Sequence, residues 1–151
     1  MRCDKGFTFI EILCVLAIMA IISGMAMPDI NRWLDRETVE SSARQITAAI
    51  RKTRQVAMTH GKDMKLELYS NGRYTIREYD VTKPSLETEQ LSARLDDISS
   101  TFPDDLYNIE VVGFNAYGRP TGGGGTIKLR AGQEWVEVSV LPVTGRVKVY
   151  R

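Results

Sequence analysis

The sequence predicts an α+β protein in which one long N-terminal helix packs on antiparallel β-sheet. Three observations lead to this fold class. The chain of 151 residues opens with a stretch that reads as one helix from near Phe7 to about His60. Short runs of alternating apolar and polar residues follow, which is typical of antiparallel strands. The second half of the helix carries a single apolar stripe, and the strands offer a sheet for that stripe to cover.

The first half of the predicted helix is apolar on all sides. Between Phe7 and Met27, Glu11 is the single ionisable side chain apart from a thiol. The 21 residues of this run would reach about 30 Å as a helix, the thickness of the hydrocarbon core of a bilayer. We therefore predict a membrane-spanning segment. A buried core helix is the alternative, but such a helix would stand at the very N-terminus and be apolar on every side.

The flanks of this run differ from those of a secretory signal. Six residues precede it, with two basic side chains, Arg2 and Lys5, and with Gly6 at the boundary. A secretory signal has its small-residue cleavage site after the apolar run. Here the run closes at Pro28 without a strict Ala-x-Ala and without a basic cluster.

The stretch Gly6-Phe7-Thr8-Phe9-Ile10-Glu11 resembles the class III leader of type IV pilins and type II secretion pseudopilins. The resemblance implies that residues 1–6 are a leader, that prepilin peptidase cuts between Gly6 and Phe7, and that the new amine of Phe7 is methylated. It further implies a transmembrane and assembly helix over residues 7–28 with a kink at Pro28, and a globular pilin domain over residues 29–151. Phe9 stands where leucine is more usual.

The same resemblance gives Glu11 a role in assembly. A lone carboxylate in hydrocarbon is unfavourable unless it is neutralised or paired. In a filament, the N-terminal amine of the neighbouring subunit can supply that pairing, so the charge favours assembly over diffusion in the bilayer. The alternative from the residues alone is a carboxylate that snorkels to the cytoplasmic face without a partner.

The resemblance also implies where the chain acts and with what. The expected location is the bacterial inner membrane, crossed once, with the N-terminus in the cytoplasm and the domain outside it. From there the chain would enter a periplasmic pseudopilus or a cell-surface pilus. Expected partners are prepilin peptidase, the inner-membrane assembly platform, the lipid bilayer before assembly, and other pilins or pseudopilins in the filament.

Beyond Pro28 the predicted helix becomes one-sided and ends at His60-Gly61, where glycine suits a left-handed cap. A free coiled coil is the competing interpretation of its stripe. The stripe consists of Leu34, Val39, Ala43, Ile46, Ile50, Thr53 and Ala57.

Strands with period-two alternation are predicted on both sides of an irregular connection. A hairpin joins residues 64–69 and 73–79 through Asn71-Gly72, the strongest short-range hairpin signal. Residues 80–106 are predicted to form a long, partly irregular connection, pinned to the core by Leu86, Leu91, Leu95 and Ile98. A second β region follows at residues 107–114, 126–129, 135–141 and 145–150.

Two further segments resemble the GspH/FimT group of minor pilins and pseudopilins. The first is residues 46–66, from the helix into the first strand. The second is a pattern near the C-terminus, made of residues 114–120, 125–129, 138–140 and 144–149. The function implied is a structural or assembly subunit, at the tip or in priming, of a type II secretion pseudopilus or a type IV pilus. The alternative is a DNA receptor in natural transformation, because some FimT members carry a basic Gly-Arg-x-Arg patch. This chain has Gly145-Arg146-Val147-Lys148 there, and the candidate DNA-binding residues are Arg146, Lys148, Arg151, Arg119, Lys128 and Arg130.

Charge is unevenly distributed along the chain. The totals are 20 basic and 19 acidic residues. Residues 80–112 hold eight acidic against two basic side chains, and residues 113–151 hold six basic against two acidic ones. This asymmetry suits directional contacts between subunits, although solvated faces explain most such runs.

No residue cluster predicts catalysis, a metal or a cofactor. Gly122–Gly125 lacks the lysine and the following helix of a phosphate loop, so we interpret it as a hairpin turn. His60 has no ligand cluster at metal-binding spacing. Asp96-Asp97 and Asp104-Asp105 are read as solvated loop carboxylates rather than an acid–base pair. With Cys3 in the leader and Cys14 in the apolar run, the domain has no disulfide.

Overall fold

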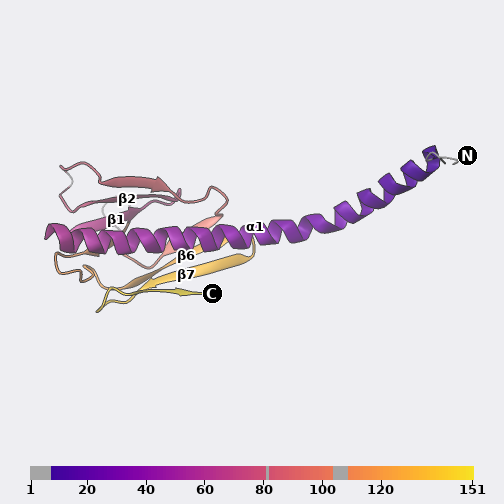
Figure 1. The fold of residues 1–151 in the computed structure, drawn as a ribbon. Coiled ribbons are helices and arrows are strands. Elements are labelled where there is room, and N and C mark those ends of the chain that lie inside the picture. Colours follow the sequence, from indigo (N-terminus) through magenta and orange to yellow (C-terminus); the bar gives the residue numbers. More distant parts are fainter. Residues whose placement is uncertain (1–7, 81, 104–108) are drawn as a thin grey trace, which may run out of the picture. The chain divides into compact units, whose positions relative to one another are not determined.

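The computed structural model describes residues 8–80, 82–103 and 109–151, with the backbone alone for residues 25–29. Gly6 and Phe7, the predicted cleavage and methylation site, lie outside these ranges, as do Asp104-Asp105. The chain divides into two compact units, Met1–Leu34 and Asp35–Arg151. Figure 1 shows the ribbon of both units.

Helix α1 spans Phe9–His60 and confirms the long helix that the periodicity predicted. Its C-terminus is capped by Gly61, at a φ of 63°, and the Lys62 amide donates to the Ala57 carbonyl over 3.2 Å. This is the left-handed cap expected from His60-Gly61. The helix is continuous through Pro28, and the kink there stays a prediction.

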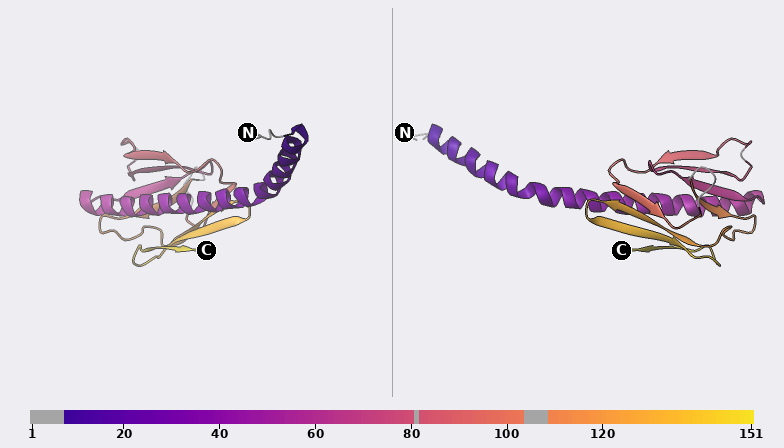
Figure 2. Two further views of the ribbon diagram at one scale, coloured as in Figure 1. Left: turned by 45° about the vertical axis from the view of Figure 1, so that its right-hand side comes forward. Right: turned by 180° about the vertical axis from the view of Figure 1, so that it is seen from behind.

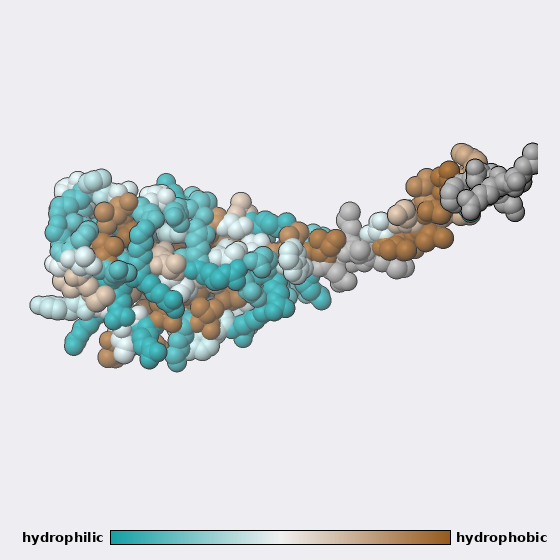
Figure 3. All heavy atoms as spheres, viewed as in Figure 1, coloured by the Kyte–Doolittle hydropathy of each residue, from teal (hydrophilic) through white to brown (hydrophobic). Residues whose placement is uncertain are grey.

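The N-terminal unit exposes its apolar residues. Each side chain from Thr8 to Gly24 is exposed, and Figure 3 shows hydrophobic residues gathered on the described part of this segment. Among the helices formed by described residues, none has the length and hydropathy that crossing a membrane requires.

The second unit contains two four-stranded antiparallel sheets. The first has the order β3-β2-β1-β5 and the second the order β4-β6-β7-β8. The views in Figures 1 and 2 agree that the part of α1 within this unit lies along both sheets. The strands are β1 (Met64–Leu68), β2 (Arg73–Glu78), β3 (Glu87–Gln90), β4 (Asp97–Ser100), β5 (Glu110–Phe114), β6 (Gly125–Ala131), β7 (Glu134–Val140) and β8 (Val147–Tyr150).

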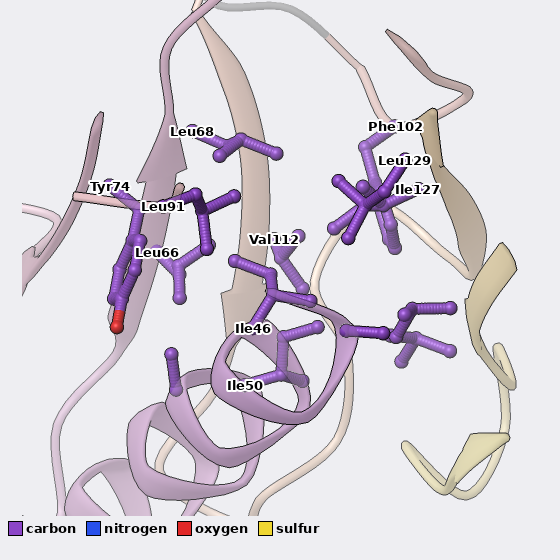
Figure 4. Close-up of a cluster of buried hydrophobic side chains, with 14 of the residues drawn as sticks. Ile46, Ile50, Leu66, Leu68, Tyr74, Leu91, Phe102, Val112, Ile127 and Leu129 are labelled. Carbon is purple, nitrogen blue, oxygen red and sulfur yellow. The ribbon is translucent and has the colours of Figure 1, made fainter. Parts of the chain in front are cut away.

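One apolar cluster holds the helix and both sheets together. From α1, Ile46 and Ile50 are fully buried and point toward the strands in Figure 4. They meet alternate residues of each sheet, as period-two strands require. The rest of the predicted stripe is buried as well, except for Leu34, which is half-buried. The interpretation as a packing helix is thus confirmed over a free coiled coil.

The hairpin between β1 and β2 is formed as Asn71-Gly72 predicted. Gly72 has a φ of 80°, its amide donates to the Tyr69 carbonyl at 2.9 Å, and the Asn71 side chain accepts the Arg73 amide at 3.0 Å. In the Gly122–Gly125 run, Gly122 and Gly123 have positive φ, while Gly125 already belongs to β6. The turn interpretation therefore holds for the first part of the run.

The prediction of an irregular connection over residues 80–106 was wrong in two places. Strands β3 and β4 lie there, each at the edge of its sheet. No residue of either strand is buried, so neither strand needs the alternation of apolar and polar residues that burial imposes. Leu91 is buried and Leu95 and Ile98 pack on the core, as predicted, but Leu86 is 55% exposed.

Candidate assembly and binding surfaces

The N-terminus of α1 is closed by a reciprocal pair of hydrogen bonds between Thr8 and Glu11. The Thr8 amide donates to Glu11 Oε2 and the Glu11 amide donates to Thr8 Oγ1, both at 3.4 Å. This is a capping box, with the acidic residue three positions after the cap. The signal Thr-x-x-Glu before an apolar run could have revealed it in the sequence. Glu11 therefore has a local structural contact in addition to any role in assembly.

After the cap, α1 presents an apolar surface on every side. Phe9 is 79% exposed and Ile18 is 58% exposed. Other large apolar side chains of this segment are exposed as well: Ile10, Ile12, Leu13, Val15, Leu16, Met19, Ile21 and Ile22. Exposed apolar patches of this extent mark a surface that another molecule covers.

Three of the six candidate DNA-binding residues share the outer face of the second sheet. In β6, Ile127, Leu129 and Ala131 are buried, so Lys128 and Arg130 project from the opposite face. Lys148 lies on the same face. It pairs with Ser139 across the strands, and the Ser139 hydroxyl lies on this face because it accepts a hydrogen bond from Thr126. The face also carries Trp135 and Tyr150, which are 40% and 47% exposed.

Part of this basic face is already neutralised. Lys128 lies 3.5 Å from Glu137 and 4.6 Å from the centroid of the Trp135 ring. Arg130 is opposite Asp97 in the register of β4 and β6. Lys148 forms no ion pair with a residue that the structure describes.

The other three candidates lie elsewhere. Arg119 and Arg146 are exposed in two neighbouring turns, since a Cβ on Gly145 would lie 3.4 Å from the Gly118 carbonyl. Arg151 instead contacts Glu40 of helix α1 at 2.9 Å and Glu134 at the start of β7 at 3.6 Å. The structure thus does not bring the six residues into one patch.

On the other side of the helix, acidic β3 is fastened to α1 by polar contacts. Glu87 pairs with Lys52 at 2.5 Å, and Glu89 accepts from Gln45 at 3.1 Å and from the Tyr74 hydroxyl. Burial and this hydrogen bond raise the pKa of Tyr74, while the same hydroxyl lowers the pKa of Glu89. Glu87 and Glu89 therefore have partners within the chain, as do Asp80, which accepts from Thr82, and Asp96, which accepts from the Gly132 amide.

Known proteins resemble this chain both in the N-terminal segment and in the fold. Residues 1–27 match the prokaryotic N-terminal methylation motif. Two fimbrial proteins of Pseudomonas aeruginosa are 28% identical over 81 residues, which is 54% of this chain and 49% of theirs. The chain thus matches about half the length of these curated relatives.

Solved structures cover more of the chain. The type IV minor pilin FimU of Pseudomonas aeruginosa aligns with a TM-score of 0.62 at 14% identity, over 79% of this chain and 92% of FimU. The minor pseudopilin EpsH of the Vibrio cholerae type 2 secretion system aligns with a TM-score of 0.59 at 14% identity, over 75% of this chain and 96% of EpsH.

The chain carries the prepilin methylation motif on a minor-pilin fold. The resemblance to pilins drawn from Gly6, Phe7 and Glu11 is thereby confirmed, and so is the fold class of a long helix packed on antiparallel sheet.

Proposed function

We propose that this chain is a minor pilin or pseudopilin, a structural subunit of a type IV pilus or of a type II secretion pseudopilus, with a place at the tip or in priming. One observation carries the proposal. The methylation motif of residues 1–27 leads directly into a helix whose apolar residues are exposed on all sides, on the fold of FimU and EpsH. In a filament, this surface would be covered by the corresponding helices of neighbouring subunits.

The proposed pathway begins at the inner membrane. Arg2 and Lys5 precede the apolar run, and basic residues favour the cytoplasmic side. We propose that residues 7–28 cross the bilayer once, with the domain extracytoplasmic, until prepilin peptidase removes residues 1–6 and the assembly platform inserts the subunit. Intact-mass measurement of the membrane-extracted chain would detect a start at Phe7 and an added methyl group. A chain that still begins at Met1 in functioning filaments contradicts the pathway.

Glu11 is proposed to pair with the N-terminal amine of the adjacent subunit. The capping box suggests a sharp test, because glutamine at the same position preserves the cap but removes the charge. Filaments should be lost in both Glu11→Ala and Glu11→Gln cells, while the helix start in Glu11→Gln stays intact. If Glu11→Gln assembles like the natural chain and only Glu11→Ala fails, Glu11 acts as a cap and not as a charge.

A second candidate function is DNA binding by the outer face of the second sheet. The observation that favours it is the combination of Lys128, Arg130 and Lys148 with exposed Trp135 and Tyr150, since single-stranded DNA is bound by basic grooves with stacking aromatics. Binding should weaken steeply with salt and fall in Arg130→Ala plus Lys148→Ala. Arg146→Ala with Arg119→Ala tests the separate pair of turns. Affinity that is undetectable or insensitive to salt removes this candidate.

A further inference from the structure

A groove of about 530 Å³ runs between α1 and the edge strand β8. Its floor is apolar and its rim is positively charged. Val136 and Val149 contribute from β7 and β8, and Ala43, Thr47 and Ala48 contribute from the helix. The rim consists of Glu40, Arg44, Arg51 and Arg151. All of these residues belong to the compact unit Asp35–Arg151.

The charges on the rim do not balance. Glu40 is the single carboxylate of the lining and is shared by Arg44, at 3.7 Å, and Arg151, at 2.9 Å, as well as by Arg36 outside the lining. Two carboxylates beside the groove add to it, since Glu37 pairs with Arg44 at 2.8 Å and Glu134 pairs with Arg151 at 3.6 Å. Arg51 is exposed and forms no ion pair or hydrogen bond with any residue in the described part of the chain. Arg51 therefore leaves the groove with an unpaired positive charge, which suits an acidic occupant.

The floor of the groove contains a buried hydroxyl without a partner. Thr47 is 7% exposed, and its Oγ1 has no hydrogen-bond partner among the described residues. Two other threonines on α1 donate to the carbonyl four residues before: Thr53 to Ala49 at 2.8 Å and Thr59 to Gln55 at 2.9 Å. A buried polar group left unpaired is costly, and because this oxygen is inaccessible to solvent, a ligand in the groove reaches it only after the Thr47 side chain rotates.

Strand β8 has a free edge along this groove. The Leu141 amide donates to the Arg146 carbonyl at 2.9 Å, so Leu141 and Arg146 form a hydrogen-bonded pair. Two residues further along the same register, Ser139 and Lys148 form the next such pair. Because bonded and non-bonded pairs alternate in an antiparallel ladder, Val147 and Val149 direct their backbone groups away from β7. Val149 is also 53% exposed, although it pairs with buried Val138 on the inner side of the sheet. Among the described residues, the outward backbone groups of Val149 have no strand partner, and its side chain is about half exposed.

We propose that this groove binds an extended segment of a partner protein in which acidic and apolar residues alternate, and that the segment adds to β8 as a fifth strand of the sheet. Backbone groups of the segment would pair with the free edge of β8, as in other cases of strand addition. Its apolar side chains would cover Val149 and Ala48, and its carboxylates would meet Arg51 and the other arginines. With the Thr47 side chain rotated toward the groove, the segment would also supply a hydrogen-bond partner for its hydroxyl.

The test uses the full-length chain in detergent and a fluorescent peptide of alternating valine and glutamate, blocked at both ends. Anisotropy should report binding, and amide hydrogen exchange of residues 147–151 should slow when the peptide is present. Arg51→Glu should weaken binding by about fivefold or more, since a rim ion pair is replaced by repulsion. Ala48→Phe, which fills the groove without a change of charge, should also abolish binding.

Matched controls separate strand addition from general attraction. Arg130→Glu makes the same change of charge on the outer face of the sheet and should leave the affinity unchanged. A peptide with lysine for glutamate should not bind, and a peptide with proline for alternate valines should lose both affinity and protection of β8. Equal losses in Arg51→Glu and Arg130→Glu, or binding without protection of residues 147–151, overturn the proposal. Self-association of the chain that Arg51→Glu abolishes, without peptide binding, overturns it in favour of a second copy.

Discussion

Both halves of helix α1 carry large apolar side chains, but only the C-terminal half buries them within the described chain. In the N-terminal half, Phe9 is 79% exposed and Ile18 is 58% exposed. In the C-terminal half, Ile46 and Ile50 are fully buried under the two sheets. Burial of apolar area is the main favourable term in folding, so the second half stabilises this chain and the first half does not. The exposed half is therefore the part of the helix whose burial requires other molecules.

The largest expected difference between the two halves is the effect on stability of truncating one isoleucine in each. Ile46→Ala should lower the free energy of unfolding by about 2–5 kcal/mol, because a fully buried side chain leaves a cavity. Ile18→Ala should leave it unchanged, because its side chain has no cover within the chain. Denaturant unfolding of the full-length chain in detergent, followed by tryptophan fluorescence, measures both. Equal effects of the two substitutions contradict the division of the helix.

Two glycines extend the comparison, because a Cβ has no room at one of them and free space at the other. A Cβ on Gly124 would collide with the Val140 carbonyl and Pro142, whereas a Cβ on Gly24 meets nothing within 4 Å. Gly124→Ala should destabilise the domain by about 1–3 kcal/mol through overpacking. Gly24→Ala should instead strengthen the exposed half of the helix by about 1 kcal/mol through helix propensity. Thermal unfolding tests the first substitution and amide exchange around residue 24 tests the second.

Within the packed half, valine in place of two threonines should have different effects on the free energy of unfolding. Thr53→Val removes a hydroxyl that is bonded to the Ala49 carbonyl, and should cost about 1 kcal/mol. Thr47→Val removes a buried hydroxyl that has no partner in the described chain, so it should be neutral or stabilising. Unfolding free energies of the two variants check this. Destabilisation of Thr47→Val to the same extent as Thr53→Val would mean that the Thr47 hydroxyl is already satisfied.

The smallest expected effect is a pH dependence at Glu40 on the exposed side of the packed half. A hydrogen bond from Arg36 lowers the pKa of this carboxylate, and Arg151 and Arg44 act in the same direction. A carboxylate with a lowered folded-state pKa stabilises the fold above its ordinary pKa, and that stability is lost as the pH falls through the folded-state value. Below the ordinary value of 4.5, the natural chain should thus lose slightly more stability than Glu40→Gln. Unfolding midpoints measured between neutral and acidic pH provide the comparison.

Much of the fold could be predicted from the sequence, because its strongest elements have strong periodicity. The stripe from Val39 to Ala57, the Asn71-Gly72 hairpin and the inner strands β6 and β7 all show the pattern that burial imposes. Strands β3 and β4 escaped prediction because none of their residues is buried, so polar residues are tolerated at every position. Leu86 was misplaced for a related reason, since hydrophobicity alone does not force a single residue inward.

Of the candidate surfaces, the N-terminal motif could be predicted from the sequence, but the grouping of the basic residues and the groove could not. The N-terminal motif is local in sequence, so Gly6, Phe7 and Glu11 could be selected without a structure, although the capping role of Glu11 was missed. The basic residues depend on tertiary placement. Arg151 is near Arg146 in sequence but turns to Glu40, and no spacing rule predicts that a C-terminal residue pairs with a helix more than a hundred positions earlier. The groove beside β8 likewise arises from packing and leaves no sequence signal.

The central claim is that the exposed half of α1 is an interface between subunits. A photoreactive residue in place of Ile18, introduced into cells that make the filament, tests it most directly. On illumination of isolated filaments, we expect crosslinks to the helix of a neighbouring pilin or pseudopilin, and loss of those crosslinks with Glu11→Gln. Crosslinks to lipid or detergent alone, in filaments that contain this chain, would contradict the claim.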